Sequence, residues 1–208
     1  DGLVCFMDDF RHGLGSWAAS GASGGALNLV ADPVRPHSPY AASMYVDAQA
    51  GSDITIETLI PFPPTSSLGI YFLLRGDGSV DGWQWTADLY TGTRRLRIGA
   101  QLRTSGYVAL LESPGIYTPV TPQLIDPIIT AGIWGIHNVV IDIDNEPYAK
   151  VQGNTGVVVP TAPSLTASAS SAVRHLDLVV NAAQLLGVTA WNVRLGAVIV
   201  TYDEPIAA

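Results

Sequence analysis

The sequence predicts an all-β protein, an antiparallel β-sandwich of the jelly-roll type. Polar and apolar residues alternate with a period of two in several segments, for example 95–103 and 175–180, whereas sustained helical periodicity is absent. About a dozen such segments lie between turn-forming residues, and the chain contains 21 Gly and 14 Pro. Short strands separated by turns are typical of two packed sheets.

Three further segments, 70–74, 139–143 and 197–200, are almost entirely apolar. This pattern indicates strands at the centre of a sheet, buried on both faces. The strand signals continue along the 208 residues without a repeat or a boundary, so we expect one domain spanning residues 1–208.

The connections between strands are expected in the proline-rich segments 61–68 and 114–131, because proline cannot donate a hydrogen bond to a neighbouring strand. Apart from Leu165, residues 160–172 are all Pro, Thr, Ala and Ser, which predicts a long surface loop or an arm lying on a neighbour. The single helical segment that we expect is a turn or two at 182–186.

The amino-acid composition indicates which kinds of partner the protein can bind. Charged residues make up 13% of the chain, against about 25% in an average soluble domain. A sparsely charged surface resists association less, so it favours a subunit of an assembly; the alternative is a monomer with a neutral polar surface. The net charge of −8 argues against binding to nucleic acid. The single cysteine, Cys5, is expected as a buried thiol, and no apolar run is long enough to insert into a membrane.

Two parts of the chain resemble concanavalin A-like and laminin G-like domains. One is the segment Trp134 to Asp144, which is followed by a turn and by the strand-plus-glycine segment 148–153. The other is the opening, where 8–10 reads Asp-Asp-Phe and Trp17 follows. The resemblance implies that the first strand lies beside the last, at 195–202. Domains of this kind bind glycans, cleave them, bind proteins or form parts of phage particles.

The carboxylates Asp142, Asp144 and Glu146 resemble the catalytic series of laminarinase-like glycoside hydrolases. Asp142 is shorter than the glutamate found at that position in the family. Glu146 precedes Pro147 in an expected turn, so it should leave the strand face. We therefore expect a polar strand face that runs into a turn, and no catalytic residues.

A calcium site is a weaker hypothesis, with Asp77 and Asp81 as candidate ligands in the Asp/Gly-rich segment 77–82. A hairpin turn explains the same residues without a metal. We expect no other cofactor and no zinc site, because the four histidines are scattered along the chain.

The aromatic pair Trp83 and Trp85 allows two interpretations. The two indoles could form a platform for stacking sugars, or they could belong to the core. Ala87 and Leu89 share their strand face, which favours the core. For His137 we expect a structural role, in packing or in a hydrogen bond to the backbone.

An arginine stripe on one strand face is the strongest candidate contact site for a partner or an anionic ligand. It contains Arg95, Arg97, Gln101 and Arg103. Arginine forms planar, bidentate contacts with carboxylates, so the stripe could meet an acidic protein surface or an anionic glycan. The alternative is pairing within the chain, with Glu57, Asp88 or Glu112.

The sequence thus favours a non-enzymatic structural or interaction subunit of a homo- or hetero-oligomeric assembly, such as a phage capsid-decoration or tail or fibre protein. Its location would be the virion or the extracellular space. The alternative is a lectin-like carbohydrate-binding module, and a glycan-cleaving enzyme ranks third. Motifs for a nucleophile elbow, a phosphate-binding loop and a zinc protease are absent.

Overall fold

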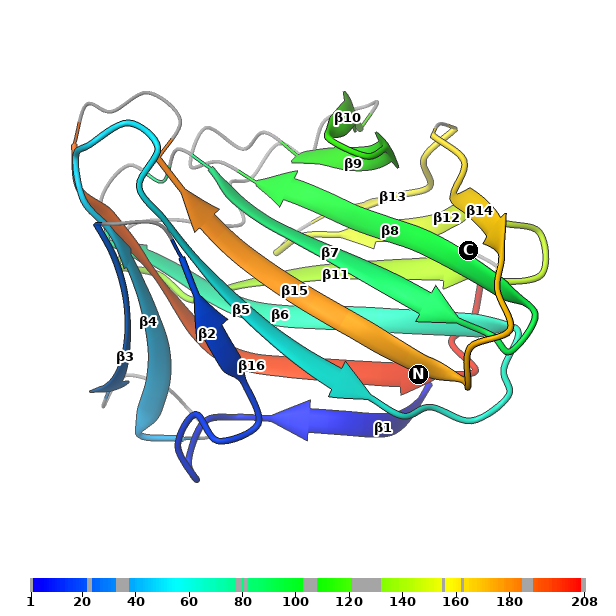
Figure 1. Cartoon of the computed structure of the whole chain (residues 1–208), viewed down its shortest axis with the longest axis horizontal. Helices are drawn as coiled ribbons and strands as arrows, with labels where there is room; N and C mark the ends of the chain where they lie inside the picture. Colours follow the sequence, from blue (N-terminus) through cyan, green and yellow to red (C-terminus); the bar gives the residue numbers. More distant parts are fainter. Residues whose placement is uncertain are drawn as a thin grey trace.

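The predicted antiparallel β-sandwich is confirmed by a computed structural model (Figure 1). It describes residues 2–21, 24–32, 38–77, 80, 82–102, 108–120, 132–154, 156–161, 163–184 and 189–206. Sixteen strands form two sheets within these ranges, and every strand pair in them is antiparallel. In the same described ranges there is no helix that is long and apolar enough to cross a membrane.

One sheet, here named the A sheet, contains eight strands. They are β1 (Leu3–Asp8), β3 (Gly25–Ala31), β4 (Tyr40–Val46), β6 (Ser67–Asp77), β11 (Gly135–Asp142), β12 (Tyr148–Gln152), β13 (Val157–Val158) and β16 (Trp191–Tyr202). Their order is β13-β12-β11-β6-β16-β4-β3. The first strand β1 pairs with the last strand β16, as the resemblance implies, and Met7 lies opposite Ile199.

The B sheet contains the other eight strands. They are β2 (Ala18–Ser20), β5 (Asp53–Ile60), β7 (Trp83–Tyr90), β8 (Arg94–Leu102), β9 (Val108–Ser113), β10 (Ile116–Pro119), β14 (Thr166–Ala169) and β15 (His175–Ala183). Their order is β10-β9-β8-β7-β15-β5-β2, and β14 also pairs with β8. Figure 1 shows these strands crossing in front of those of the A sheet.

The core lies between the sheets and follows the alternation of the strands. On β7 the inward side chains of Trp83, Trp85 and Leu89 are fully buried. The ring of Phe72, from the A sheet, packs against both indoles, with centroids 5.3 Å from Trp83 and 5.4 Å from Trp85. The core interpretation of the two tryptophans is therefore confirmed, and a sugar platform at these residues is excluded.

Tyr148 joins the two sheets through its hydroxyl group. It lies on β12 of the A sheet, and its oxygen accepts a hydrogen bond from Gly99 N at 3.0 Å. The hydroxyl is within reach of the carbonyl oxygens of Gly99 (3.2 Å) and Leu111 (2.9 Å). Along β8 the partner changes from β9 to β14 near this point. The tyrosine thus satisfies backbone groups where the sheet divides, as buried polar groups require.

Three local expectations need correction. Residues 160–172 are not simply a loop or an arm, because Thr166–Ala169 form β14 against β8. The helical turn expected at 182–186 is wrong at its start, since Ala183 ends strand β15; residues 185–186 lie outside the described ranges. Cys5 is half-buried rather than buried, with Sγ 3.4 Å from the carbonyl oxygen of Val200.

Candidate functional site

The outer face of the B sheet carries a continuous array of polar side chains, because every second residue of its strands points away from the core. At one end lies a ladder of amides across three strands. Asn181 Nδ2 donates to Thr55 Oγ1 at 2.8 Å, Gln84 Nε2 to Asn181 at 3.4 Å, and Gln101 Nε2 to Gln84 at 3.5 Å. These contacts hold the side chains of Asn181, Gln84 and Gln101 in one row.

At the other end of this face, Asp88 on β7 lies opposite Arg97 on β8. Arg97 binds its carboxylate with two nitrogens, Nε at 2.8 Å and Nη2 at 2.7 Å, and Arg95 Nη2 binds it as well. Burial tends to raise the pKa of Asp88, but the hydrogen bonds and charges of the two arginines outweigh burial and lower it. Asp88 is therefore held as a carboxylate.

A chain of contacts connects Asp88 to a second carboxylate on the next strand. Arg95 lies over the ring of Tyr90, 5.8 Å from its centroid, and Tyr90 stacks on His175 at 4.4 Å. His175 Nε2 is 3.4 Å from Asp177 Oδ1. Asp177 in turn lies directly opposite Asp88. Two like charges in facing positions destabilise a sheet, and here each has a basic neighbour.

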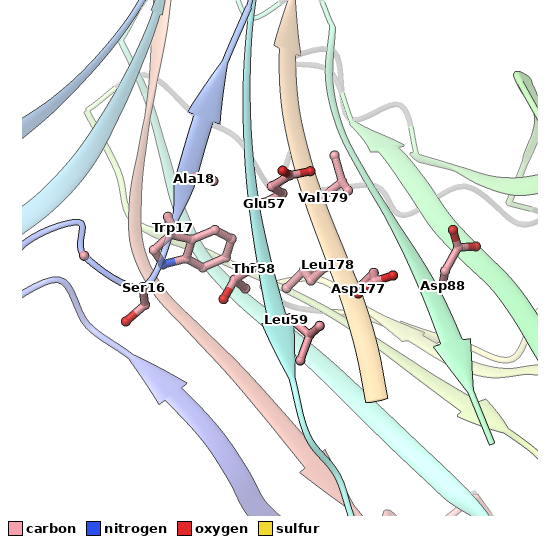
Figure 2. A pocket seen from close by; sticks show the side chains of 11 residues that line it. Ser16, Trp17, Ala18, Glu57, Thr58, Leu59, Asp88, Asp177, Leu178 and Val179 are labelled. Atoms are coloured by element: carbon pink, nitrogen blue, oxygen red, sulfur yellow. The ribbon is translucent and has the colours of Figure 1, made fainter. Parts of the chain in front are cut away.

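An open pocket of about 660 Å³ lies on this face (Figure 2). Its sheet side includes Glu57 and Leu59 from β5 and Asp177 and Val179 from β15. Leu59 is 63% exposed, which is unusual for a leucine and makes the pocket floor partly apolar. Asp88 completes one side.

The wall of the pocket is a loop fixed by the opening motif. Trp17 lines the pocket, and its Nε1 donates to Asp8 Oδ2 at 3.0 Å. Asp8 Oδ1 accepts from the backbone N–H of Phe10 at 2.8 Å. The side chain of Phe10 is fully buried, and its ring centroid lies 6.2 Å from that of Trp17. The backbone of Phe10 is in the left-handed region, with φ of 61°. The motif at 8–17 thus places residues 15–18 beside strands β5 and β15.

A smaller cavity of about 80 Å³ lies further along the same face. It is lined by Arg95 and Arg97 of β8, by Thr166 and Ser168 of β14, and by Pro114. Because Asp88 lines the larger pocket and pairs with both arginines, it stands between the two hollows.

The arginine stripe is thus brought together only in part. Arg95 and Arg97 pair with Asp88, one of the three acids expected as partners within the chain. Gln101 lies on the same face but belongs to the amide ladder. Arg103 lies outside the described residues. The site that the stripe predicts is therefore a pair of arginines beside β14.

The carboxylates that resemble a catalytic series form a turn. Asp142 Oδ1 accepts from the backbone N–H groups of Asp144 (3.1 Å) and Asn145 (3.0 Å), and its Oδ2 accepts from Asn145 Nδ2 at 2.7 Å. Glu146 has left the strand, with φ of 64°, and its carboxylate pairs with Arg94. The expected turn is confirmed.

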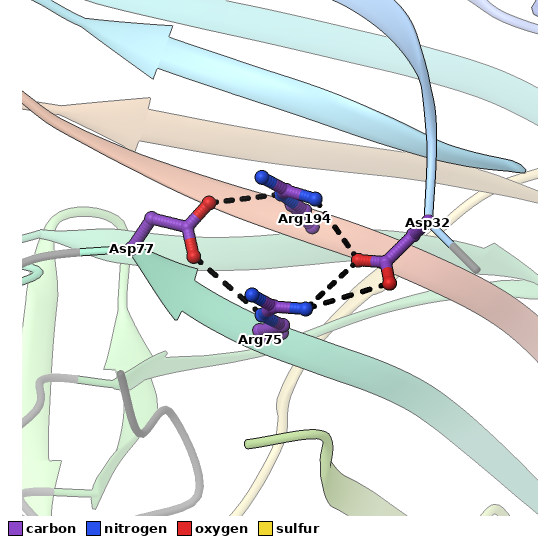
Figure 3. A network of polar contacts seen from close by, with 4 residues as sticks. All are labelled: Asp32, Arg75, Asp77 and Arg194. Carbon is purple, nitrogen blue, oxygen red and sulfur yellow. Dashed lines mark hydrogen bonds and ion pairs between the residues drawn. The ribbon is translucent and has the colours of Figure 1, made fainter. Parts of the chain in front are cut away.

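Asp77, a candidate calcium ligand, belongs to a network of ion pairs on the outer face of the A sheet (Figure 3). Arg194 Nε is 2.8 Å from Asp77 and Arg75 Nε is 3.5 Å away. Both arginines also bind Asp32, at 3.0 and 3.1 Å. Asp81 is not among the described residues, and no group of three or more metal-binding side chains occurs among those that are. Calcium binding stays a prediction.

His137 has the structural role that we expected, and it is packing. The ring is fully buried and lies 6.2 Å from that of Phe72 and 6.1 Å from that of Trp85. Neither ring nitrogen has a hydrogen-bond partner in the described part of the chain. Complete burial lowers the pKa of His137 to about 3, so the ring is neutral at physiological pH.

The open pocket is the feature that the sequence did not identify. The alternation at 53–58 and 175–180 predicts that Glu57, Asp177 and Val179 point outward. It does not predict that β5 and β15 are neighbours, or that the loop carrying Trp17 lies beside them. Those facts depend on strand pairing between distant segments.

The sequence matches no protein-family model and no curated protein. Solved structures do share the fold. A carbohydrate esterase of the Shiga toxin-encoding bacteriophage phi24B has 12% sequence identity and a TM-score of 0.55, covering 98% of this chain and 100% of that chain. The carbohydrate recognition domain of Emp46p has 10% identity and a TM-score of 0.53, with coverage of 99% and 96%. Peanut lectin has 10% identity and a TM-score of 0.52, with coverage of 94% and 95%. At such identities the likeness concerns the fold alone, and that fold is the concanavalin A-like jelly roll.

Proposed function

We propose that the protein binds carbohydrate, without cleaving it, through the outer face of the B sheet. The observation that carries this proposal is the open pocket of about 660 Å³, in which carboxylates surround an exposed apolar floor. Sugars present many hydroxyl donors together with apolar C–H faces. Ionised carboxylates accept only, so Asp88 suits the hydroxyls, and Leu59 and Val179 suit the C–H faces.

The fold is compatible with this proposal, since a lectin and a carbohydrate recognition domain adopt it. An esterase adopts it too, so the fold does not separate binding from catalysis. The state of Asp88 argues against general-acid catalysis by this residue. A general acid must hold a proton near the working pH, whereas the arginines lower the pKa of Asp88.

Replacing Leu59 with arginine is expected to weaken glycan binding by about tenfold or more, because the longer charged side chain would occupy the apolar floor. Leu59 is mostly exposed, so the fold should tolerate the change. The measurement is a glycan-array screen of the wild type, followed by titration of the bound glycans against L59R.

The matched control is Val157→Arg, which adds the same side chain at a residue of the A sheet that is 54% exposed. It should leave glycan binding unchanged. Non-catalytic carbohydrate binding would be contradicted if the wild-type protein bound no glycan on the array. It would also be contradicted if new reducing ends appeared when the protein was incubated with a bound glycan.

A second candidate function, a subunit contact with a second copy of the chain, is favoured by an apolar band on the A sheet. The band consists of Val4, Met7, Leu73, Ile136 and Ile199. Met7 faces Ile199 across β1 and β16, and Leu73 faces Ile136 across β6 and β11. Val4, Met7 and Ile136 are 58%, 56% and 46% exposed. Contiguous exposed apolar surface marks contact sites.

The charges next to the apolar band suit a second copy. Arg75 stands two residues along β6 from Leu73, in the network of two arginines and two aspartates shown in Figure 3. This network is neutral and carries both signs, so two copies related by a twofold axis can meet without net repulsion. A phage capsid-decoration or tail or fibre protein, in the virion or outside the cell, would use such a contact.

The double substitution Met7→Asp and Ile136→Asp is expected to convert an oligomer into monomers, because it places unpaired charges within an apolar contact. Sedimentation velocity over a range of protein concentrations measures the change. Val173→Asp, at a residue that is 84% exposed and away from the band, should leave the mass unchanged. A wild-type protein that stays monomeric at every concentration would exclude this contact.

A further inference from the structure

The two arginines beside β14 hold donors that Asp88 does not use. Arg97 turns Nε and Nη2 to Asp88, whereas Arg95 contacts it through Nη2 alone. Arg95 Nε is buried, and it has no hydrogen-bond partner among the described residues. A buried donor without a partner costs free energy unless a ligand or water satisfies it. The arginine pair is therefore incomplete as a purely internal ion pair.

The small cavity beside these arginines has the residues that an anion needs. The cavity has a volume of about 80 Å³, and its lining residues include Arg95, Arg97 and Ser168, whose hydroxyl can donate. The nearby hydroxyl of Thr166 is already used, because it donates to the carbonyl oxygen of Glu112 at 2.7 Å. Guanidinium groups bind carboxylates and other oxyanions through parallel N–H donors, which gives strength and orientation.

Charge also favours an anion at this end of the face. Two arginines and one aspartate leave a local charge of +1, on a chain whose net charge is −8. The larger pocket, on the other side of Asp88, has Glu57 and Asp177 among its lining residues. The face therefore changes from acidic to basic along a row that crosses β5, β15, β7 and β8.

The distances along this row fit one extended ligand. Neighbouring strands lie about 4.8 Å apart, so the row from β5 to β8 spans about 14 Å. Leu59, Asp177, Asp88 and Arg97 occupy facing positions in the row, and Thr166 of β14 faces Arg97. A ligand lying across the strands would reach both hollows.

We propose that the natural ligand is an acidic oligosaccharide, whose neutral sugars occupy the larger pocket and whose anionic group, a carboxylate or a sulfate, binds Arg95 and Arg97 in the small cavity. This inference rests on the proposed function, since it names the class of glycan bound at the same face. Arg95 is a specificity-determining residue in this arrangement, and the affinity decreases as the salt concentration rises.

The test is a glycan array that holds each acidic oligosaccharide beside its neutral counterpart, with uronates paired with their methyl esters and sulfated sugars with their unsulfated forms. The wild type should prefer the acidic member of at least one pair, and the type of pair identifies carboxylate or sulfate. Arg95→Gln should weaken the binding of the acidic member by about 10- to 100-fold and leave the binding of the neutral member unchanged.

Arg94→Gln is the matched control, because it removes the same charge from the adjacent residue, whose side chain pairs with Glu146 instead. It should change the binding of neither member. Equal binding of acidic and neutral members by the wild type, or an equal effect of R95Q and R94Q, would overturn this inference and leave the proposed function standing. If the wild type bound no glycan at all, both this inference and the proposed function would be wrong.

Discussion

Replacing Trp85 with alanine is expected to lower the free energy of unfolding by about 3–5 kcal/mol. The indole is fully buried between the sheets, against Phe72 at 5.4 Å and His137 at 6.1 Å. Truncation loses the transfer free energy of the ring and leaves a cavity that two hydrogen-bonded sheets cannot close. Urea denaturation at neutral pH measures the change as a lower midpoint at an unchanged slope.

The matched control is Thr86→Ala, one residue further along the same strand and pointing to the outer face. Its effect should stay within about 0.5 kcal/mol. If the two substitutions lowered the free energy of unfolding equally, Trp85 and Thr86 would not lie on opposite faces of β7 as described. A small cost for W85A together with reduced glycan binding would restore the sugar-platform interpretation of Trp83 and Trp85.

The orientation of β7 shows what sequence alone can predict. Strand alternation is a local property, so Ala87 and Leu89 suffice to assign Trp83 and Trp85 to the core. The same reasoning correctly placed Arg95, Arg97 and Gln101 on one face. It also predicted the turn at Asp142, because proline and neighbouring polar residues act within a few positions.

The partners of these residues could not be predicted in the same way. Asp88 binds Arg97 because β7 and β8 form a hairpin, and the sequence suggested this pairing as one of three. The approach of Asp177 to Asp88 depends on the pairing of β15 with β7, although Asp177 lies 89 residues after Asp88 in the chain. Long-range pairing is selected by the packing of the whole core, which no local pattern encodes.

Strand β14 is a case in which the local composition predicts the wrong secondary structure. Residues 160–172 contain no aromatic residue and only one bulky aliphatic residue, Leu165, so their composition predicts a loop. The strand forms because the β8 edge between Arg94 and Arg97 offers unpaired backbone groups, which Thr166–Ala169 satisfy. This pairing brings Thr166 and Ser168 to the arginines and so creates the small cavity, a feature that the composition could not reveal.

The burial of His137 lowers the stability of the folded protein at acidic pH, although the ring is not part of the proposed binding face. In the unfolded chain a histidine gains a proton below a pKa of about 6.5. In the folded protein, burial among Phe72 and Trp85 lowers the pKa of His137 to about 3. Between these two values the unfolded state binds one more proton than the folded state, so the free energy of unfolding falls as the pH falls.

Lowering the pH from about 7 to about 5 is expected to cost about 2 kcal/mol of stability through His137, because each pH unit below 6.5 costs about 1.4 kcal/mol. The variant His137→Leu, which cannot take up a proton, should lose this dependence. Urea denaturation of both proteins across this range gives the difference, and the other histidines cancel between them. The lowered pKa values of Asp88, Asp142 and Glu204 add a further loss only at lower pH, as these carboxylates take up protons. Parallel pH profiles for the two proteins would show that the ring gains its proton in the folded state, and hence that water or a rearrangement reaches it within the sandwich.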